Sequence, residues 1–129
     1  MPKKRNHEDK EQAALFEWAA FEQANHPELR WMYAIPNGGK RDKGTGKLLK
    51  KTGVKGGVSD ICLPVKRNVF SGLYLEMKTP ENKALKIRKG VVSKEQLEFG
   101  EFVTGQGYLF VVAYGWESAA ETITSYLAQ

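Results

Sequence analysis

Two acidic residues and a lysine are spaced for metal chemistry in the segment VSDICLPVKRNVFSGLYLEMK, which runs from Val58 to Lys78. Two apolar runs around a Lys-Arg-Asn turn predict an antiparallel hairpin. In a symmetric hairpin centred on Asn68, Asp60 lies opposite Glu76, and strand alternation points Lys78 the same way as Glu76. Opposed carboxylates destabilise a sheet unless a cation bridges them, so the pattern predicts a divalent-metal site.

The same residues could instead form the solvated face of a half-exposed hairpin, with Lys78 neutralising one acid. A register shift of one residue would also place the two acids on opposite faces. The residues just before Asp60 favour a site, because Gly56, Gly57 and Ser59 are small and allow a backbone or a ligand to approach closely.

Length and composition predict one domain, spanning residues 1–129, with a single hydrophobic core. Lys and Arg number 20 against 15 Asp and Glu, and the net charge of +5 favours a polyanionic partner. The single cysteine, Cys62, excludes a disulfide framework and a Cys-rich zinc site, which fits a reducing cytoplasm. The chain has neither an 18-residue apolar run nor a secretory signal pattern, so we expect a soluble protein without a membrane span.

The first segment, from about Asn6 to Asn25, predicts an amphipathic helix that ends before His26-Pro27. Its inward face at helical spacing comprises Glu8, Glu11, Gln12, Leu15, Trp18, Ala19 and Glu22, with Phe16, Ala20 and Phe21 widening the apolar stripe. Glu8 is either a third acid of the metal site or a residue that only stabilises the positive end of the helix. Glu11 competes with Glu8 for the first of these roles.

The remaining pattern predicts a mixed α/β fold with a sheet flanked by helices. The expected elements are a strand at Trp31–Ile35, a short helix around Lys47–Lys51, a flexible basic loop from Glu81 to Val92, a helix from Ser93 to Thr104, a strand from Tyr108 to Tyr114 buried on both faces, and a last helix after Gly115. Ser93-x-x-Gln96 matches a capping box, which already gives Gln96 a structural role.

Two lysine-rich stretches flank the acidic residues in the sequence, and we expect them to contact a nucleic-acid backbone. Mobile, solvated loops are the alternative. The basic residues concerned are Lys40, Arg41, Lys47, Lys50, Lys51 and Lys55 in the first stretch and Lys86, Arg88 and Lys89 in the second.

Ser59-Asp60 followed by Glu76-x-Lys78 resembles the motif of the PD-(D/E)xK nuclease superfamily, with Ser59 in place of the proline. A longer ordered set of motifs resembles the VRR-NUC family, and in particular its short stand-alone phage and bacterial members. These motifs are an N-terminal helix with Glu8 four residues before Gln12, IPNGGKR from Ile35, GVKGGVSD from Gly53, GLYLEMK from Gly72, the helix start at Ser93-x-x-Gln96 and the strand start at Gly107-Tyr108. Together they cover nearly the whole chain.

The resemblance implies a restriction-endonuclease-like fold, a mixed central β-sheet flanked by α-helices, and divalent-metal-dependent cleavage of DNA. It implies that Glu8, Asp60 and Glu76 are the acidic site residues, Lys78 the lysine, and Gln96 a polar residue near the site. Stand-alone members are similar to homodimeric enzymes that resolve four-way DNA junctions. We therefore expect a homodimeric junction-resolving endonuclease.

The expected cofactor is Mg²⁺ or Mn²⁺, held by Asp60 and Glu76, by the Met77 carbonyl, and by Glu8 directly or through water. Lys78 lies near two acids, so we expect it to stay charged and to orient the nucleophile or neutralise the transition state. The alternative function is a non-catalytic DNA-binding module that keeps the nuclease fold, and cleavage of RNA is a weaker possibility. Phe16, Trp18 and Phe21 on the first helix are candidates for a dimer contact, although such a stripe is more often core.

Overall fold

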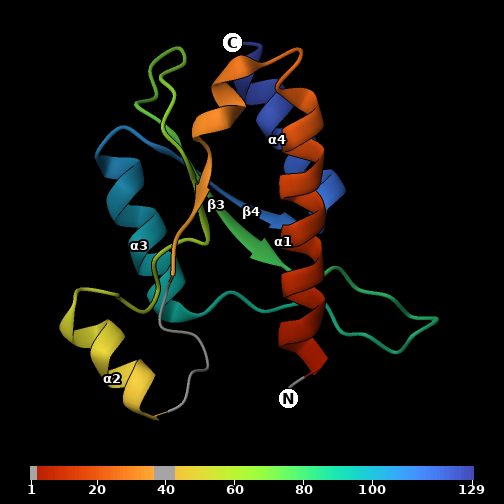
Figure 1. Cartoon of the computed structure of the whole chain (residues 1–129), viewed down its shortest axis with the longest axis vertical. Helices are drawn as coiled ribbons and strands as arrows, with labels where there is room; N and C mark the ends of the chain where they lie inside the picture. Colours follow the sequence, from red (N-terminus) through yellow and green to blue (C-terminus); the bar gives the residue numbers. More distant parts are fainter. Residues whose placement is uncertain (1–2, 37–42) are drawn as a thin grey trace.

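The computed structural model describes residues 3–36 and 43–129, and its side chains from residue 7 to 36 and from 46 to 129. Its elements in chain order are α1 (Lys3–Glu22), the 3-10 helix η1 (Pro27–Trp31), β1 (Tyr33–Ala34), α2 (Lys43–Lys51), β2 (Ile61–Leu63), β3 (Leu73–Lys78), α3 (Lys94–Gly105), β4 (Leu109–Tyr114) and α4 (Trp116–Leu127). Figure 1 shows the helices arranged around the strands.

The strands form one mixed sheet in the order β1-β2-β3-β4. β1, β2 and β3 pair antiparallel, whereas β4 runs parallel to β3, so the chain crosses over between them through α3. The α/β prediction, a mixed sheet flanked by helices, is therefore confirmed.

The register between β2 and β3 is the one that the sequence predicts. Leu63 pairs with Leu73 and Ile61 with Leu75, and the same register continued by one residue sets Asp60 opposite Glu76. Alternation buries the apolar residues of β3 on one face. At the tip of the hairpin Arg67 pairs with Phe70, one residue out of this register, so the predicted symmetry ends before the turn.

The apolar face of the sheet packs against α1 and α4 (Figure 1). Leu15 of α1 and Ile123 of α4 are fully buried between the helices and the sheet. The hydroxyl of Tyr126 donates a hydrogen bond to the Val65 carbonyl (2.6 Å), which fixes the end of α4 to the loop after β2. These contacts set the position of α1, on which Glu8 lies.

Helix α3 covers the other face of the sheet beside β4. Both bonds of the predicted capping box are present, since Ser93 Oγ accepts from Gln96 N (3.1 Å) and Gln96 Oε1 accepts from Ser93 N (2.8 Å). Gly100 lies so close to β4 that a Cβ atom there would be 2.5 Å from the Phe110 ring. The backbone of α3 therefore packs directly on the Phe110 ring of β4, and the first turn of α3 contacts β3 through Gln96 and Glu76.

Several predicted boundaries differ from the structure. Helix α1 ends at Glu22, and Trp31 belongs to η1 rather than to a strand, because Pro27 starts a short 3-10 turn that carries it. β1 is accordingly reduced to two residues, and α2 starts at Lys43 instead of near Lys47.

Two burial predictions are wrong. Ala20 and Phe21 are exposed, because a helix that buries Leu15 and Ala19 turns the following two positions towards solvent. Strand β4 is not buried on both faces: most of its side chains are half-buried, since among the described strands β4 pairs with β3 alone and lies at the edge of the sheet.

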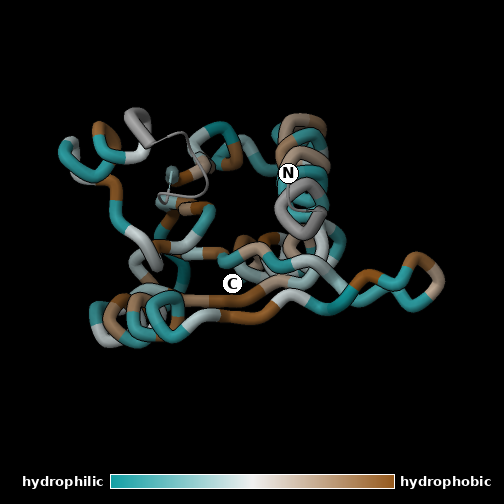
Figure 2. The backbone as a smooth tube through the Cα atoms, turned by 90° about the horizontal axis from the view of Figure 1, so that it is seen from below, coloured by the Kyte–Doolittle hydropathy of each residue, from teal (hydrophilic) through white to brown (hydrophobic). Residues whose placement is uncertain are grey.

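The stretch expected to be a flexible basic loop is instead a hairpin. Asn82 and Ile87 exchange both backbone hydrogen bonds (2.9 and 2.8 Å), and Gly90 N donates to the Thr79 carbonyl (2.9 Å). We call residues 79–90 the basic hairpin. It extends from the body of the molecule as an arm (Figures 1 and 2).

No helix within residues 3–36 and 43–129 is long and apolar enough to cross a membrane.

The contact at Gly100 yields a stability prediction. Gly100→Ala forces α3 away from Phe110, and we expect the free energy of unfolding to fall by about 1–3 kcal/mol. Gly105→Ala in the same helix is the matched control, because a Cβ atom there meets nothing within 4 Å. Urea unfolding followed by circular dichroism compares the two variants, and equal stability of both would show that the close packing of α3 is unimportant.

Candidate active site

Asp60, which directly precedes β2, and Glu76 of β3 are neighbours. Asp60 Oδ2 accepts a hydrogen bond from the backbone N–H of Met77 (2.7 Å), which fixes its carboxylate beside β3. The Asp60 carbonyl accepts from Ile35 N (2.7 Å), so the same residue is also fixed to the end of β1. The structure thus brings the two predicted acids together and restrains Asp60 from two sides.

Glu76 is buried in this arrangement, with only 1% of its surface exposed. Its Oε2 accepts from Gln96 Nε2 (3.0 Å) and lies 3.7 Å from Lys78 Nζ. Burial is the largest cause that raises the pKa of Glu76 to about 9, and the negative charge of Asp60 and a side-chain hydrogen bond with Asp60 follow. The positive charge of Lys78 acts in the opposite direction, and the charge of Glu8 makes the smallest contribution. A metal-free Glu76 therefore carries a proton at neutral pH.

The unpaired oxygen of Glu76, one of three buried polar atoms without a partner among the described residues, is a test of whether a divalent cation fits. Glu76 Oε1, Ser59 Oγ and Thr79 Oγ1 are buried and make no hydrogen bond within the described part of the chain. Such orphaned atoms are uncommon in native proteins, and a buried carboxylate oxygen beside a second carboxylate gains a partner when a cation binds. Both carboxylates offer the hard oxygen ligands that Mg²⁺ and Mn²⁺ prefer.

Glu8 and Glu11, which compete for the first acidic position, have different surroundings. Glu11 Oε1 accepts from the backbone N–H of Trp116 (2.8 Å), at the first residue of α4. Glu8 contributes to the electrostatic field at Glu76 instead. Glu11 therefore has a capping role on α4, whereas the charge of Glu8 contributes to the raised pKa of Glu76.

Among residues 7–36 and 46–129, no three His, Cys, Asp or Glu side chains are close enough together to form a metal-binding cluster as they lie. The ligands that this part of the chain offers are thus the carboxylates of Asp60 and Glu76, supplemented by backbone oxygen and water. Magnesium is commonly bound in this way, through one or two carboxylates together with water and substrate phosphate.

Gln96 has two roles in the structure. Its Oε1 completes the capping box of α3 while its Nε2 donates to Glu76, so one amide fixes both the helix start and the buried acid. Lys78 is also held closely. It is 6% exposed, and Gly90 of the basic hairpin packs against it, where a Cβ atom would lie 3.3 Å from Lys78 Cβ and Cδ.

The small residues before Asp60 allow a close approach, as the sequence predicts, and the approach is to a backbone. Gly57 has a φ of +84°, and a Cβ atom there would lie 2.9 Å from the Glu95 carbonyl oxygen in the first turn of α3. The burial of Ser59 and Thr79, which adjoin Asp60 and Lys78 in the sequence, was not predicted, since no residue pattern marks a serine or a threonine as buried.

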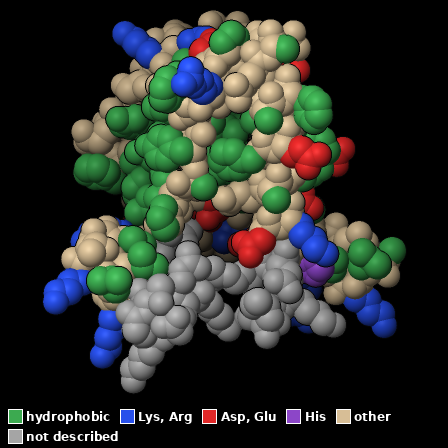
Figure 3. Space-filling view, in the orientation of Figure 1, with side chains coloured by type: hydrophobic (Ala, Val, Ile, Leu, Met, Phe, Trp, Pro, Cys, Tyr) green, Lys and Arg blue, Asp and Glu red, His purple; other side chains and the backbone are tan. Residues whose placement is uncertain are grey.

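The predicted nucleic-acid-binding residues lie on two separate parts of the structure. Lys40 and Arg41 are outside the described residues. The other members are exposed: Lys47, Lys50, Lys51 and Lys55 on α2 and the loop after it, and Lys86, Arg88 and Lys89 on the basic hairpin. Figure 3 shows acidic side chains at a hollow in this face of the molecule, with basic side chains projecting on both sides below it.

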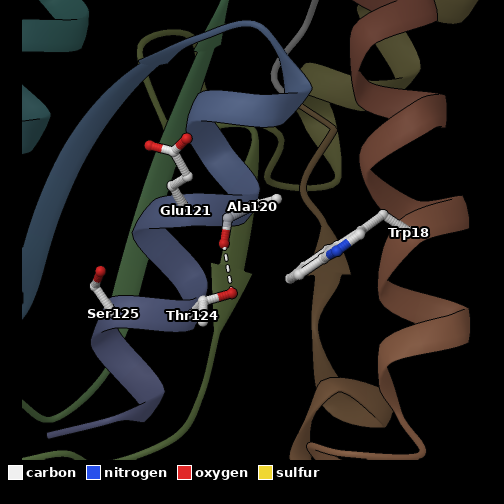
Figure 4. A pocket seen from close by; sticks show the side chains of 5 residues that line it. All are labelled: Trp18, Ala120, Glu121, Thr124 and Ser125. Carbon is white, nitrogen blue, oxygen red and sulfur yellow. Dashed lines mark hydrogen bonds between the residues drawn. The ribbon is translucent and has the colours of Figure 1, made fainter.

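An open pocket of about 400 Å³ lies between α1 and α4, away from these residues. Its lining consists of Trp18, Ala120, Glu121, Thr124 and Ser125 (Figure 4). The Thr124 hydroxyl donates a hydrogen bond to the Ala120 carbonyl of its own helix (2.9 Å). None of the predicted site residues lines this pocket.

Comparison with known proteins finds similarity at the level of structure. No family model and no curated protein matches the sequence. A solved structure described as a VRR_NUC domain protein superposes with a TM-score of 0.73 at 23% sequence identity, over 94% of this chain and 88% of the other. The two proteins share a fold, as the motif resemblance predicts.

Burial of Glu76 predicts how stability changes with pH. The pKa of Glu76 is raised from its model-compound value of 4.5 to about 9 on folding, so the folded protein holds a proton that the unfolded chain releases. In EDTA, the free energy of unfolding should therefore fall as pH rises from about 5 to about 9, by on the order of a few kcal/mol.

Urea unfolding at several pH values measures this dependence. Glu76→Gln removes the ionisable group and should flatten the curve, whereas Glu98→Gln replaces an exposed acid of α3 and should leave it as in the wild type. Parallel curves for the wild type and Glu76→Gln would contradict the buried, protonated acid.

Proposed function

We propose that this chain, which has the fold of a VRR_NUC domain protein, is a divalent-metal-dependent endonuclease that hydrolyses DNA phosphodiester bonds at Asp60 and Glu76. The observation that carries the proposal is the buried carboxylate of Glu76. Its Oε1 makes no hydrogen bond to a described residue, its Oε2 lies 3.7 Å from Lys78 Nζ, and the charge of Asp60 acts on it. The name of the structural neighbour, a VRR_NUC domain protein, agrees with a nuclease function.

The metal is Mg²⁺ or Mn²⁺ in this proposal, with Asp60 and Glu76 as ligands, the Met77 carbonyl as a third oxygen, and Glu8 as a direct or water-mediated ligand. A cation bound there would polarise the scissile phosphate and lower the pKa of a bound water. The raised pKa of Glu76 means that binding must displace its proton, so affinity for the metal should increase with pH.

The protein side chains prepare this arrangement before substrate arrives. Met77 N holds one oxygen of Asp60, and Gln96 Nε2 holds one oxygen of Glu76, so both carboxylates are oriented before a cation binds. Lys78 contributes a positive charge near the same point, suited to orienting the nucleophile or to opposing charge that builds on the phosphate. Because these groups are already oriented, little reorganisation is needed during the reaction.

DNA is the proposed polyanion. The exposed lysines of α2 and the basic hairpin lie apart from the acids and carry positive charge where a sugar-phosphate backbone passing the site would need it. The net charge of +5 supports the same partner.

We extend the proposal to branched DNA and to a homodimer, since paired cuts across a four-way junction require two sites related by a two-fold axis. The stripe expected to supply the dimer contact is not intact: Phe16 and Trp18 pack against the core, and Phe21 alone of the three is largely exposed, at 79%. A sedimentation-equilibrium measurement that finds only monomer at working concentration would contradict the dimer but not the nuclease.

Cleavage of labelled linear, flapped and four-way DNA with Mg²⁺ or Mn²⁺ tests the nuclease directly. Asp60→Asn keeps an acceptor for Met77 N but removes a charge from the metal site, so we expect at least about a 100-fold loss of rate with DNA affinity nearly unchanged. Asp9→Asn, at an exposed position of α1, is the matched control and should cleave normally.

Outcomes of this assay separate the alternatives. Full activity of a folded Asp60→Asn protein would disprove the site, and so would cleavage that survives EDTA. If every substrate is bound and none is cut with either metal, the chain is a DNA-binding module with a nuclease fold. A matched RNA substrate, cut faster than DNA, would change the substrate class.

Glu8 and Glu11 provide a second test, because the charge of Glu8 acts on Glu76 whereas Glu11 caps α4. We expect Glu11→Ala to lower the free energy of unfolding by about 1 kcal/mol through loss of the Trp116 bond, while cleavage by the folded protein is retained. Glu8→Ala should reduce cleavage without that loss of stability. Thermal melting and cleavage rates of both variants check the assignment, and the reverse pattern would make Glu11 the metal-site acid.

A further inference from the structure

The basic hairpin has an apolar side chain at its apex. Leu85 is 68% exposed, and it lies between Lys83 and Lys86 with Arg88 and Lys89 following on the returning arm. Figure 2 shows hydrophobic residues near the outer end of this arm, with hydrophilic ones beside them. A single exposed leucine is ordinary on a protein surface, so exposure alone does not mark a function. Two further observations support a function for Leu85: the position of the hairpin beside the candidate site and the hydrogen bonds of its tip.

The base of the hairpin is attached to the candidate site. Gly90 N donates to the Thr79 carbonyl (2.9 Å), and Gly90 packs on the Lys78 side chain. On the outgoing arm Pro80 lies against Gly115, where a Cβ atom would be 3.3 Å from Pro80 Cγ, at the start of α4. The arm is therefore anchored at both of its ends to the residues around the catalytic lysine, and a contact made by its tip has a fixed relation to the site.

The tip itself is a hydrogen-bonded turn. Asn82 Oδ1 accepts from Leu85 N (3.1 Å), and Lys86 N donates to the Lys83 carbonyl (3.2 Å). Lys86 has a φ of +56°, in the left-handed region where glycine or asparagine is usual and a lysine costs about 1–2 kcal/mol. These bonds present Leu85 outward with a positive charge on each side.

We propose that the basic hairpin is a wedge that inserts Leu85 between DNA bases near the scissile phosphate while the flanking cations bind the backbone on either side. The proposal rests on the proposed function, because it takes DNA as the partner. Proteins that kink or open DNA insert apolar side chains of this kind between base steps and hold the phosphates with nearby cations. A branch point, where stacking is already broken, is the DNA that admits the side chain most easily.

The length of the arm limits where insertion occurs. Six residues from Pro80 to Leu85 span at most roughly 20 Å when extended. At about 3.4 Å per step along one strand, the opened step lies within about six nucleotides of the phosphate at the site.

Fluorescence of 2-aminopurine tests the wedge without relying on cleavage. The base is placed at successive positions across the branch of a four-way DNA and along a linear duplex, and the full-length protein is added in EDTA. We expect a rise of at least about twofold at one or two positions near the branch, because unstacking relieves quenching. Leu85→Ala should abolish the rise while affinity changes by less than about threefold, and Leu85→Met should restore it.

Two further variants separate apolar insertion from charge. Val69→Ala is the matched control, since Val69 is 76% exposed in the turn between β2 and β3, and it should leave the rise intact. The combined variant Lys83→Gln, Lys86→Asn and Arg88→Gln, with asparagine chosen for the left-handed position, should weaken binding. It should also reduce the slope of log affinity against log salt by about 3.

The outcomes distinguish the wedge from the nuclease. A rise that persists in Leu85→Ala, or one that is lost equally in Val69→Ala, overturns the wedge. Cleavage in Mg²⁺ with no rise at any position overturns the wedge and leaves the nuclease standing. A Leu85-dependent rise without cleavage supports the wedge and overturns the nuclease. A protein that binds none of these DNAs overturns both.

Discussion

Burial of one carboxylate next to another is the constraint on which the site and much of its surroundings depend. Glu76 lies within a sheet face that is closed over by α3, and Asp60 is fixed beside it by Met77 N. Ionising both acids is unfavourable in the metal-free protein: burial first, and the charge of Asp60 next, raise the pKa of Glu76 to about 9. The β2–β3 register keeps the two acids on one face, because a shift of one residue would place them on opposite faces. The hydrogen bonds from Met77 N and Gln96 Nε2 then orient the two carboxylates.

The residues that hold the site also hold the fold. Gln96 closes the capping box of α3 and bonds Glu76, while Gly57 lets the strand entering the site pass against the backbone of Glu95. Glu11 of α1 caps α4, one turn along the helix from Glu8. Site geometry and stability are thus coupled through shared side chains, and changes at these positions affect both.

Sequence patterns predict the parts of this fold that local rules control. Alternating apolar residues and the turn at Asn68, which has a φ of +52°, are enough for the β2–β3 register, and Ser93-x-x-Gln96 is enough for the start of α3. They do not predict the basic hairpin, because its two arms form a single bridge, between Asn82 and Ile87, and so short a pairing leaves no periodic signal in the sequence. Spacing predicts the capping role of Gln96 and the place of Glu8 on the inward helix face, but not the bond from Gln96 to Glu76, since contacts between distant segments leave no trace in a single sequence. The burial of Ser59 and Thr79 depends on the same kind of contact.

The crossover from β3 to β4 has a consequence for the order of folding. Because β4 runs parallel to β3, it can pair only after the chain has passed through α3, and the neighbours of Glu76 come from α1, β2 and α3. Contacts of such long sequence separation form late and slowly. During synthesis, a chain that has not yet added α3 and β4 holds its two acids without the amide of Gln96 or the cover of the helix, so both carboxylates remain hydrated. The assembled acid pair is therefore a property of the finished domain, absent from the partly made chain.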